Sequence, residues 1–194
     1  MLARSSQGTA WRERARLMLV WLLVTVLLEA AGATEIELPE YRVKAAFLYN
    51  FAKFVDWPSK AFSNPRAAFG FCVLGEDPFG SDLEDVVKGK TVNERESALK
   101  RIRGLQGLDG CHIVFVSPSE QERYAQILRS LRNAPVLTVG ETAEFTKMGG
   151  IISFYLDGDR IRLEINIDAG ERAGLKISSR LLKLARVVRA SWRN

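Results

Sequence analysis

The sequence predicts an α/β fold, in which one domain holds a mixed, mostly parallel central β-sheet flanked by helices. Short apolar runs alternate with segments of helical spacing, which is typical of parallel sheets. Near the C-terminus, the alternating runs Ile151–Leu156 and Arg160–Ile167 are joined by Asp157-Gly158-Asp159, which is typical of a β-hairpin. A last helix is expected after this C-terminal hairpin. A long apolar segment around residue 50 predicts the central helix of the fold.

This central helix is expected to span Tyr41–Trp57. Its apolar residues cover most of the circumference of a helix rather than one stripe, which indicates burial on several sides. Pro58 ends it, since the residue before a proline is already pushed out of helical geometry. The segment is too short, and carries too many charges, to be a good membrane-spanning candidate.

Residues 1–33 have the pattern of a secretory signal peptide. Arginines precede the apolar run Leu17–Leu28, and Ala31-Gly32-Ala33 offers a cleavage site. The run is shorter than the roughly 20 apolar residues of a bilayer span, although an uncleaved N-terminal anchor remains the alternative. Cleavage between Ala33 and Thr34 would leave residues 34–194 as one exported domain.

The charge balance gives weak evidence for a nucleic-acid partner, and none is expected. The whole chain has a net charge of +5, and the signal peptide accounts for part of it, because its four arginines outnumber Glu13 and Glu29. The small positive charge that remains is ordinary for a soluble protein.

The other elements follow in order along the chain. Strands are predicted at Phe69–Gly75, Ala98–Ile102, Cys111–Ser117 and Val136–Val139. Helices are predicted from Asp77-Pro78 to about Val87, from Ser119 to about Leu131, as a short turn at Thr142–Met148, and from about Ser178 to Val188. Ser119 is expected to cap the second of these, with Glu122 completing a capping box, and Asp168–Gly174 is expected to be a connector.

No catalytic or metal-binding constellation emerges. His112 follows Cys111 in a predicted strand, so the two side chains point to opposite faces and cannot form a dyad. One histidine and two separated cysteines do not make a zinc site. Lys88-Gly89-Lys90-Thr91 resembles the end of a P-loop, but Glu84 stands where that motif needs glycine. We therefore expect a protein without enzyme activity, cofactor or metal.

Cys72 and Cys111 are the two cysteines, and they allow one pairing. After export they meet an oxidising compartment, where a disulfide persists. The alternative is two buried thiols on neighbouring strands.

Two polar surfaces remain as candidate binding sites. The predicted last helix carries a basic band, which is either a solvated face or a contact for anionic lipid or an acidic partner. On the hairpin strand Arg160–Ile167, alternation places the aliphatic residues inward and four polar residues on the other face. These polar residues form either a solvent-facing ladder or a recognition surface: Arg160, Arg162, Glu164 and Asn166. The basic band consists of Arg180, Lys183, Arg186 and Arg189, followed by Arg193.

Motifs along almost the whole exported chain resemble the YfiR family. They are VKAAFLYNFAKFVDWP (43–58), CVLGEDPFG (72–80), CHIVFVSPSE (111–120), LTVGE (137–141), GGIISF (149–154), RLEINI (162–167) and AGLKISSRLLKLARVV (173–188). The resemblance implies a periplasmic protein without enzyme activity that restrains a membrane-bound diguanylate cyclase through the cyclase's periplasmic sensor region. It also implies sequestration by an outer-membrane lipoprotein and a homodimer.

The resemblance further implies a disulfide between Cys72 and Cys111, and it singles out Glu164 within the LEIN segment as a partner-binding position. A second cysteine pair of the family's repressor is absent here, which puts redox control of that kind in doubt. We expect the hairpin face centred on Glu164, with Asp168–Leu175, to bind the partner. The alternative is a periplasmic small-ligand sensor or carrier, whose hairpin and last helix enclose a pocket.

Overall fold

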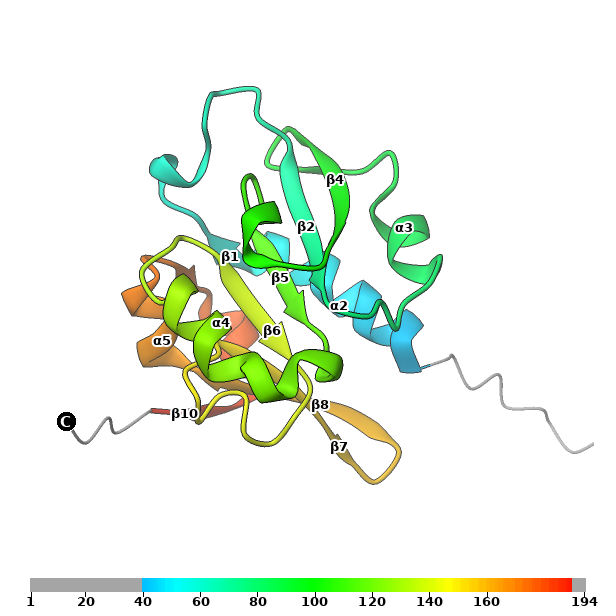
Figure 1. Cartoon of the computed structure of the whole chain (residues 1–194), viewed down its shortest axis with the longest axis vertical. Helices are drawn as coiled ribbons and strands as arrows, with labels where there is room; N and C mark the ends of the chain where they lie inside the picture. The colour runs from blue at the N-terminus through cyan, green and yellow to red at the C-terminus, as the bar shows by residue number, and fades with distance from the viewer. Residues whose placement is uncertain (1–39, 190–194) are drawn as a thin grey trace, which may run out of the picture. The chain divides into compact units, whose positions relative to one another are not determined.

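A computed structural model describes residues 40–189, which build an α/β unit around one large sheet (Figure 1). The predicted signal peptide, its cleavage site between Ala33 and Thr34, and Arg193 lie outside the described residues. The described helices are α2 (Glu40–Phe54), α3 (Asp82–Val87), α4 (Tyr124–Leu131), α5 (Ile167–Arg172) and α6 (Ser179–Leu182), with 3₁₀ turns η1 (Ser59–Ala61), η2 (Leu105–Gly107) and η3 (Pro118–Arg123). None of them is long and apolar enough to cross a membrane.

Eight strands form the large sheet in the order β10-β8-β7-β6-β5-β2-β4-β3. They are β2 (Phe69–Leu74), β3 (Thr91–Val92), β4 (Arg95–Ile102), β5 (Ile113–Val116), β6 (Leu137–Gly140), β7 (Ile152–Asp157), β8 (Arg160–Asn166) and β10 (Ala185–Val188). Strands β4, β2, β5, β6 and β7 are parallel, β8 returns antiparallel to β7, and β10 runs parallel to β8. The predicted mostly parallel sheet with its hairpin is therefore confirmed.

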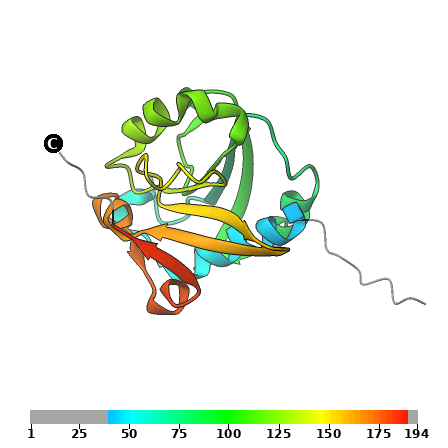
Figure 2. The same cartoon turned by 90° about the horizontal axis from the view of Figure 1, so that it is seen from below.

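Helices cover both faces of this sheet. The α2 residues Leu48 and Phe51 pack with Phe69 and Phe71 of β2 on one face. The α4 residues Ile127, Leu128 and Leu131 pack with Leu74, Val114 and Val116 on the other face. Figure 2 shows α4 (green) on one side of the hairpin strands and β10 (red) beside β8 (orange). Because β2 lies between two apolar layers, all six of its residues are buried.

The central helix α2 ends at Phe54, three residues before the predicted end. Val55 and Asp56 instead form β1 (Val55–Asp56), which pairs antiparallel with β9 (Lys176–Ile177). Backbone pairing with a segment more than a hundred residues away therefore overrides the helical spacing that continues to Trp57.

The predicted last helix, Ser178–Val188, is wrong for most of its length. Only α6 is helical, and Ala185–Val188 form the edge strand β10. The β-branched Val187 and Val188 favour a strand, and β10 gains a complete parallel register against Leu163–Asn166 of β8. The predicted basic band along a helix therefore does not exist in this form.

Two smaller expectations also change. Asp168–Gly174 is not a mere connector, since α5 occupies Ile167–Arg172 and is capped by Asn166. The helical segment after β5 is capped by Ser117 rather than Ser119, and it begins as the 3₁₀ turn η3 before α4. Pro118 at the first turn suits this earlier start.

Candidate functional site

The four predicted partner-binding residues lie on β8, but they do not share one exposed face. Arg160 and Arg162 are exposed near the hairpin turn, whereas Glu164 is only 7% exposed and Asn166 is fully buried. The expectation of a continuous exposed polar row is therefore wrong for Glu164 and Asn166. Alternation along the strand placed these side chains on one face correctly, but it gave no sign that the 142–149 loop and β10 cover that face.

Glu164 is the centre of a buried polar cluster that joins three segments. Its carboxylate accepts a hydrogen bond from Thr146 Oγ1 in the 142–149 loop and a 2.7 Å hydrogen bond from Arg186 Nε on β10. Arg186 also reaches the same carboxylate through Nη2. A buried carboxylate needs such partners, because burial of an unpaired charge is very costly. The cluster therefore fixes the edge strand and the loop against β8.

Asn166 continues this cluster into α5. Its Oδ1 atom accepts a 3.1 Å hydrogen bond from the backbone N–H of Ala169, which caps the helix. Its Nδ2 atom donates a 3.0 Å hydrogen bond to the carbonyl of Thr146. Thr146 therefore contacts Glu164 through its side chain and Asn166 through its backbone, so the loop, the end of β8 and the start of α5 form one connected unit.

Three exposed arginines and the exposed Asp157 lie around Glu164. Parallel register places Arg186 beside Glu164, and antiparallel register places Tyr155 beside Arg162. The Arg186 guanidinium lies 4.8 Å from the centre of the Tyr155 ring. Arg162 lies 3.4 Å from Asp157 across the hairpin, in an exposed pair that adds little stability. We call Tyr155, Arg160, Arg162 and Arg186 the hairpin surface.

The other members of the predicted basic band lie in different elements and do not form one surface. Arg180 lies on α6, Lys183 lies in the following turn, and both are exposed. Arg189 lies 3.6 Å from Asp168 at the start of α5, which gives β10 a second ionic link to the rest of the fold.

A second buried ionic cluster was not predicted from the sequence. Lys44 on α2 is only 4% exposed, and its ammonium group pairs with Glu141, which follows β6, and with Glu40. Tyr41 donates a 2.9 Å hydrogen bond to Glu141. Burial, together with this bond to a carboxylate, raises the pKa of Tyr41. The sequence did contain a signal for this cluster: Lys44 lies in a segment that is apolar nearly all round, and a buried lysine needs an acidic partner.

Cys72 and Cys111 are joined by a disulfide, with their Cα atoms 5.8 Å apart, a normal separation for such a bond. The disulfide ties β2 to the segment that enters β5, on the sheet face that α4 covers. His112 points to the opposite face, as predicted, where it stacks between Phe62 and Phe69.

Both ring nitrogens of His112 form hydrogen bonds to backbone groups of the fold. Its Nδ1 atom accepts a 2.9 Å hydrogen bond from the backbone N–H of Gly70, so the proton of the neutral ring lies on Nε2. Nε2 lies 3.1 Å from the carbonyl of Ala61 and donates to it. Burial lowers the pKa of His112, and the nearby positive charges of Arg95 and Lys100 act in the same direction. The ring is therefore neutral and locked, which does not suit a proton-transfer role.

Within residues 40–189, no group of three or more His, Cys, Asp or Glu side chains is arranged to hold a metal ion. The arrangement around Glu164 is suited to holding a surface in shape rather than to chemistry.

Comparison with known protein families finds a match over most of the chain. The family described as YfiR/HmsC-like matches residues 41–186, which is more than half of the 194-residue chain and includes every element from α2 to the start of β10. The chain therefore belongs to the YfiR/HmsC-like family, and this membership supports a regulatory role in cyclic-di-GMP signalling.

Proposed function

We propose that the protein is a secreted periplasmic regulator that restrains a membrane-bound diguanylate cyclase by binding the cyclase's periplasmic sensor region, and so lowers cyclic-di-GMP. Family membership and the signal-peptide pattern of residues 1–33 support this proposal. The observation that carries it is the buried Glu164 cluster beneath the hairpin surface. Glu164 holds Arg186 beside Arg160 and Arg162 at one end of a rigid sheet, which is a suitable place for recognition.

The buried position of Glu164 changes its proposed role. A carboxylate that is 7% exposed offers little area to a partner, but it fixes Arg186, whose side chain is 62% exposed. We assign direct contact with the partner to Arg160, Arg162 and Arg186, and a positioning role to Glu164 and Asn166. Since the contacting residues are cationic, the complementary surface of the partner is acidic.

The test is a charge reversal that leaves the buried cluster intact. Arg162→Glu is expected to raise cyclic-di-GMP in cells to the level seen without the protein, and to abolish recovery of the cyclase in a membrane pull-down. Because Arg162 is exposed, the free energy of unfolding should change by no more than about 1 kcal/mol.

Arg180→Glu is the matched control, because it makes the same charge change at an exposed position outside the hairpin surface. It should leave both readouts unchanged. Normal repression and normal recovery of the cyclase with Arg162→Glu would exclude the hairpin surface as the docking site.

The proposal includes a homodimer and sequestration by an outer-membrane lipoprotein. Light scattering of the purified protein tests the dimer, and the same pull-down, performed on outer membranes, tests the lipoprotein. Mass spectrometry of the periplasmic fraction tests the export step, for which the expected N-terminus is Thr34. An intact Met1 there would reject cleavage.

A further inference from the structure

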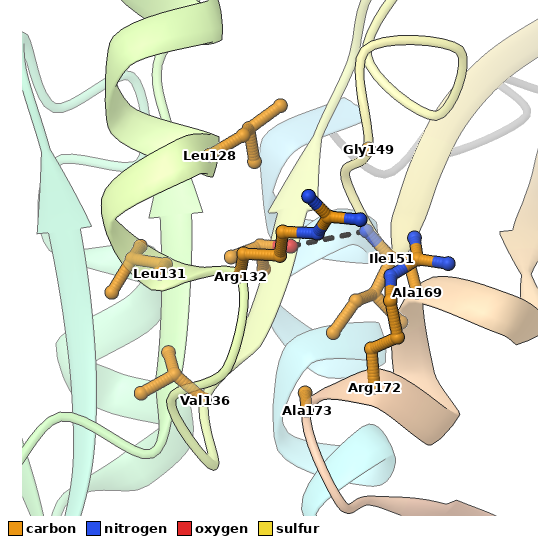
Figure 3. Close-up of a pocket in the computed structure, with 10 residues that line it drawn as sticks. Leu128, Leu131, Arg132, Val136, Gly149, Ile151, Ala169, Arg172 and Ala173 are labelled. Carbon is orange, nitrogen blue, oxygen red and sulfur yellow. Dashed lines mark hydrogen bonds between the residues drawn. The ribbon is translucent and has the colours of Figure 1, made fainter. Parts of the chain in front are cut away.

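Two adjoining hollows lie between α4, the 142–149 loop and α5. The first has a floor formed by Leu131, Val136 and Ile151 (Figure 3). The second has a volume of about 360 Å³ and includes Ala125 and Met148. Both are lined by Leu128, Arg132, Gly149 and Arg172, so they form one continuous depression, which we call the α4–α5 groove.

The rim of the α4–α5 groove is cationic. Arg129, Arg132, Lys147 and Arg172 line it, and among residues 40–189 no aspartate or glutamate belongs to the lining of either hollow. Glu144, which lies 3.0 Å from Lys147, is outside that lining. Figure 3 shows the side chains of Arg132 and Arg172 reaching from opposite sides toward the space beside Gly149 and Ile151. Three arginines around one hollow, together with Lys147, whose charge Glu144 partly offsets, produce a field that attracts an anion.

The floor of the groove has a different chemistry from its rim. Leu128 and Met148 belong to the apolar layer beneath α4, and both line the second hollow. A ligand that matches both features therefore carries an anionic group at one end and an apolar body at the other. The second hollow, with a volume of about 360 Å³, is near the lower limit of small-molecule pockets, so it fits a compact ligand.

We propose that the α4–α5 groove binds a small organic anion, with its apolar body on Leu128 and Met148 and its phosphate or carboxylate group at Arg132 and Arg172. Guanidinium groups suit both kinds of anion, because their planar fork of N–H donors matches two oxygens of either group. The ligand is a free molecule in solution rather than the headgroup of a membrane lipid, because the hollow of about 360 Å³ encloses a compact body.

The groove also adjoins the Glu164 cluster. Thr146 contacts Glu164 and Asn166, while the next three residues of the same loop line the groove. Arg172 lies at the end of α5, whose start is capped by Asn166. A bound anion would therefore contact both segments that Asn166 links, although binding itself does not depend on the regulatory role.

Calorimetric titration of the purified protein with phenyl phosphate tests the site. We expect saturable binding that weakens as the salt concentration rises, since exposed charges are screened. Arg132→Ala should weaken binding about tenfold, as loss of one charge-assisted hydrogen bond does. Arg129→Ala should weaken it by a smaller factor, and both residues are exposed, so both variants should fold.

Arg103→Ala is the matched control, because Arg103 is also exposed but lines a different hollow beyond the end of β4. It should change the affinity less than about twofold, since a distant screened charge contributes little. Met148→Gln tests the floor and should weaken binding of phenyl phosphate without affecting inorganic phosphate. Phenylacetate in place of phenyl phosphate distinguishes a carboxylate preference from a phosphate preference, and either result supports the site.

Three outcomes would overturn the proposal. The first is equal loss of affinity in Arg132→Ala and Arg103→Ala, which would indicate a general charge effect. The second is inorganic phosphate binding as tightly as phenyl phosphate, which would remove the role of the apolar floor. The third is sedimentation with phosphatidylglycerol vesicles without any binding of phenyl phosphate, which would assign the groove to a membrane surface.

Discussion

Arg186 on the edge strand β10 donates a 2.7 Å hydrogen bond from Nε to the buried carboxylate of Glu164 on β8. The two residues are register partners in parallel strands, so the side-chain pair reinforces the backbone pairing of the last strand of the sheet. The burial is unequal, because the Glu164 side chain is 9% exposed and that of Arg186 is 62% exposed. The two partners therefore have different importance for stability.

Arg186→Ala should destabilise the protein more than Glu164→Gln does. Arg186→Ala leaves the buried carboxylate of Glu164 with Thr146 as its remaining side-chain donor. Glu164→Gln leaves Arg186, whose side chain is already largely exposed to water. We expect a loss of about 1–3 kcal/mol in the free energy of unfolding for Arg186→Ala, measured by urea denaturation. Arg162→Ala, in an exposed pair, is the control and should cost less than about 1 kcal/mol.

Lys44 and Glu141 should be strongly coupled. Lys44→Met removes the cation that neutralises Glu141, whose side chain is 7% exposed, so it should cost about 3–5 kcal/mol, as breaking a buried pair does. The double variant Lys44→Met with Glu141→Gln should recover a substantial part of that loss. A double-mutant cycle measures the coupling. Additive losses would show that the two side chains do not depend on each other.

The strands of the sheet were predictable where the local pattern is complete. Phe69–Leu74 and Ile113–Val116 are short, apolar and bounded by glycine or proline, and the Asp157-Gly158 turn marks the hairpin between β7 and β8. The apolar alternation along β8 likewise placed Leu163 and Ile165 in the core. In these segments the hydrophobic period and the turn residues agree with the tertiary structure.

The errors occur where distant segments decide the outcome. Arg186 and Val187 lie in a segment whose basic and apolar residues fit a helix, and only pairing with β8 makes it a strand. Alternation placed Glu164 on the polar face of β8, but the cover over that face comes from Thr146 and Arg186, which no local pattern connects to it. The same limit applies to Lys44, whose partner Glu141 is 97 residues away.

Loss of the disulfide should lower stability without removing the fold. Cys72 and Cys111 are separated by 39 positions, for which loop-closure entropy gives about 4 kcal/mol as an upper figure. Cys72→Ala with Cys111→Ala should approach that loss in urea denaturation. Alkylation of periplasmic protein before and after reduction tests the bond itself, and two free thiols before reduction would contradict it.

His112 should make stability depend on pH below neutrality. Burial lowers the pKa of the folded-state ring below the unfolded value of about 6.5, because the charged ring would lose its hydration, and the positive charges of Arg95 and Lys100 act in the same direction. Between the lowered folded pKa and about 6.5, the unfolded chain binds more protons than the folded chain, so stability falls as pH falls. The contribution is fully present above about pH 6.5, and the loss below it approaches 1.4 kcal/mol per pH unit.

Urea denaturation between pH 7 and pH 5 measures this slope. His112→Asn retains an acceptor near Gly70 but cannot titrate, so it should be less stable at pH 7 and lose less stability on acidification. Other groups titrate in the same range in both proteins, and the difference between the two curves therefore isolates His112. Parallel curves would mean that the ring accepts a proton in the folded state at no cost, which its contacts with Gly70 and Ala61 argue against.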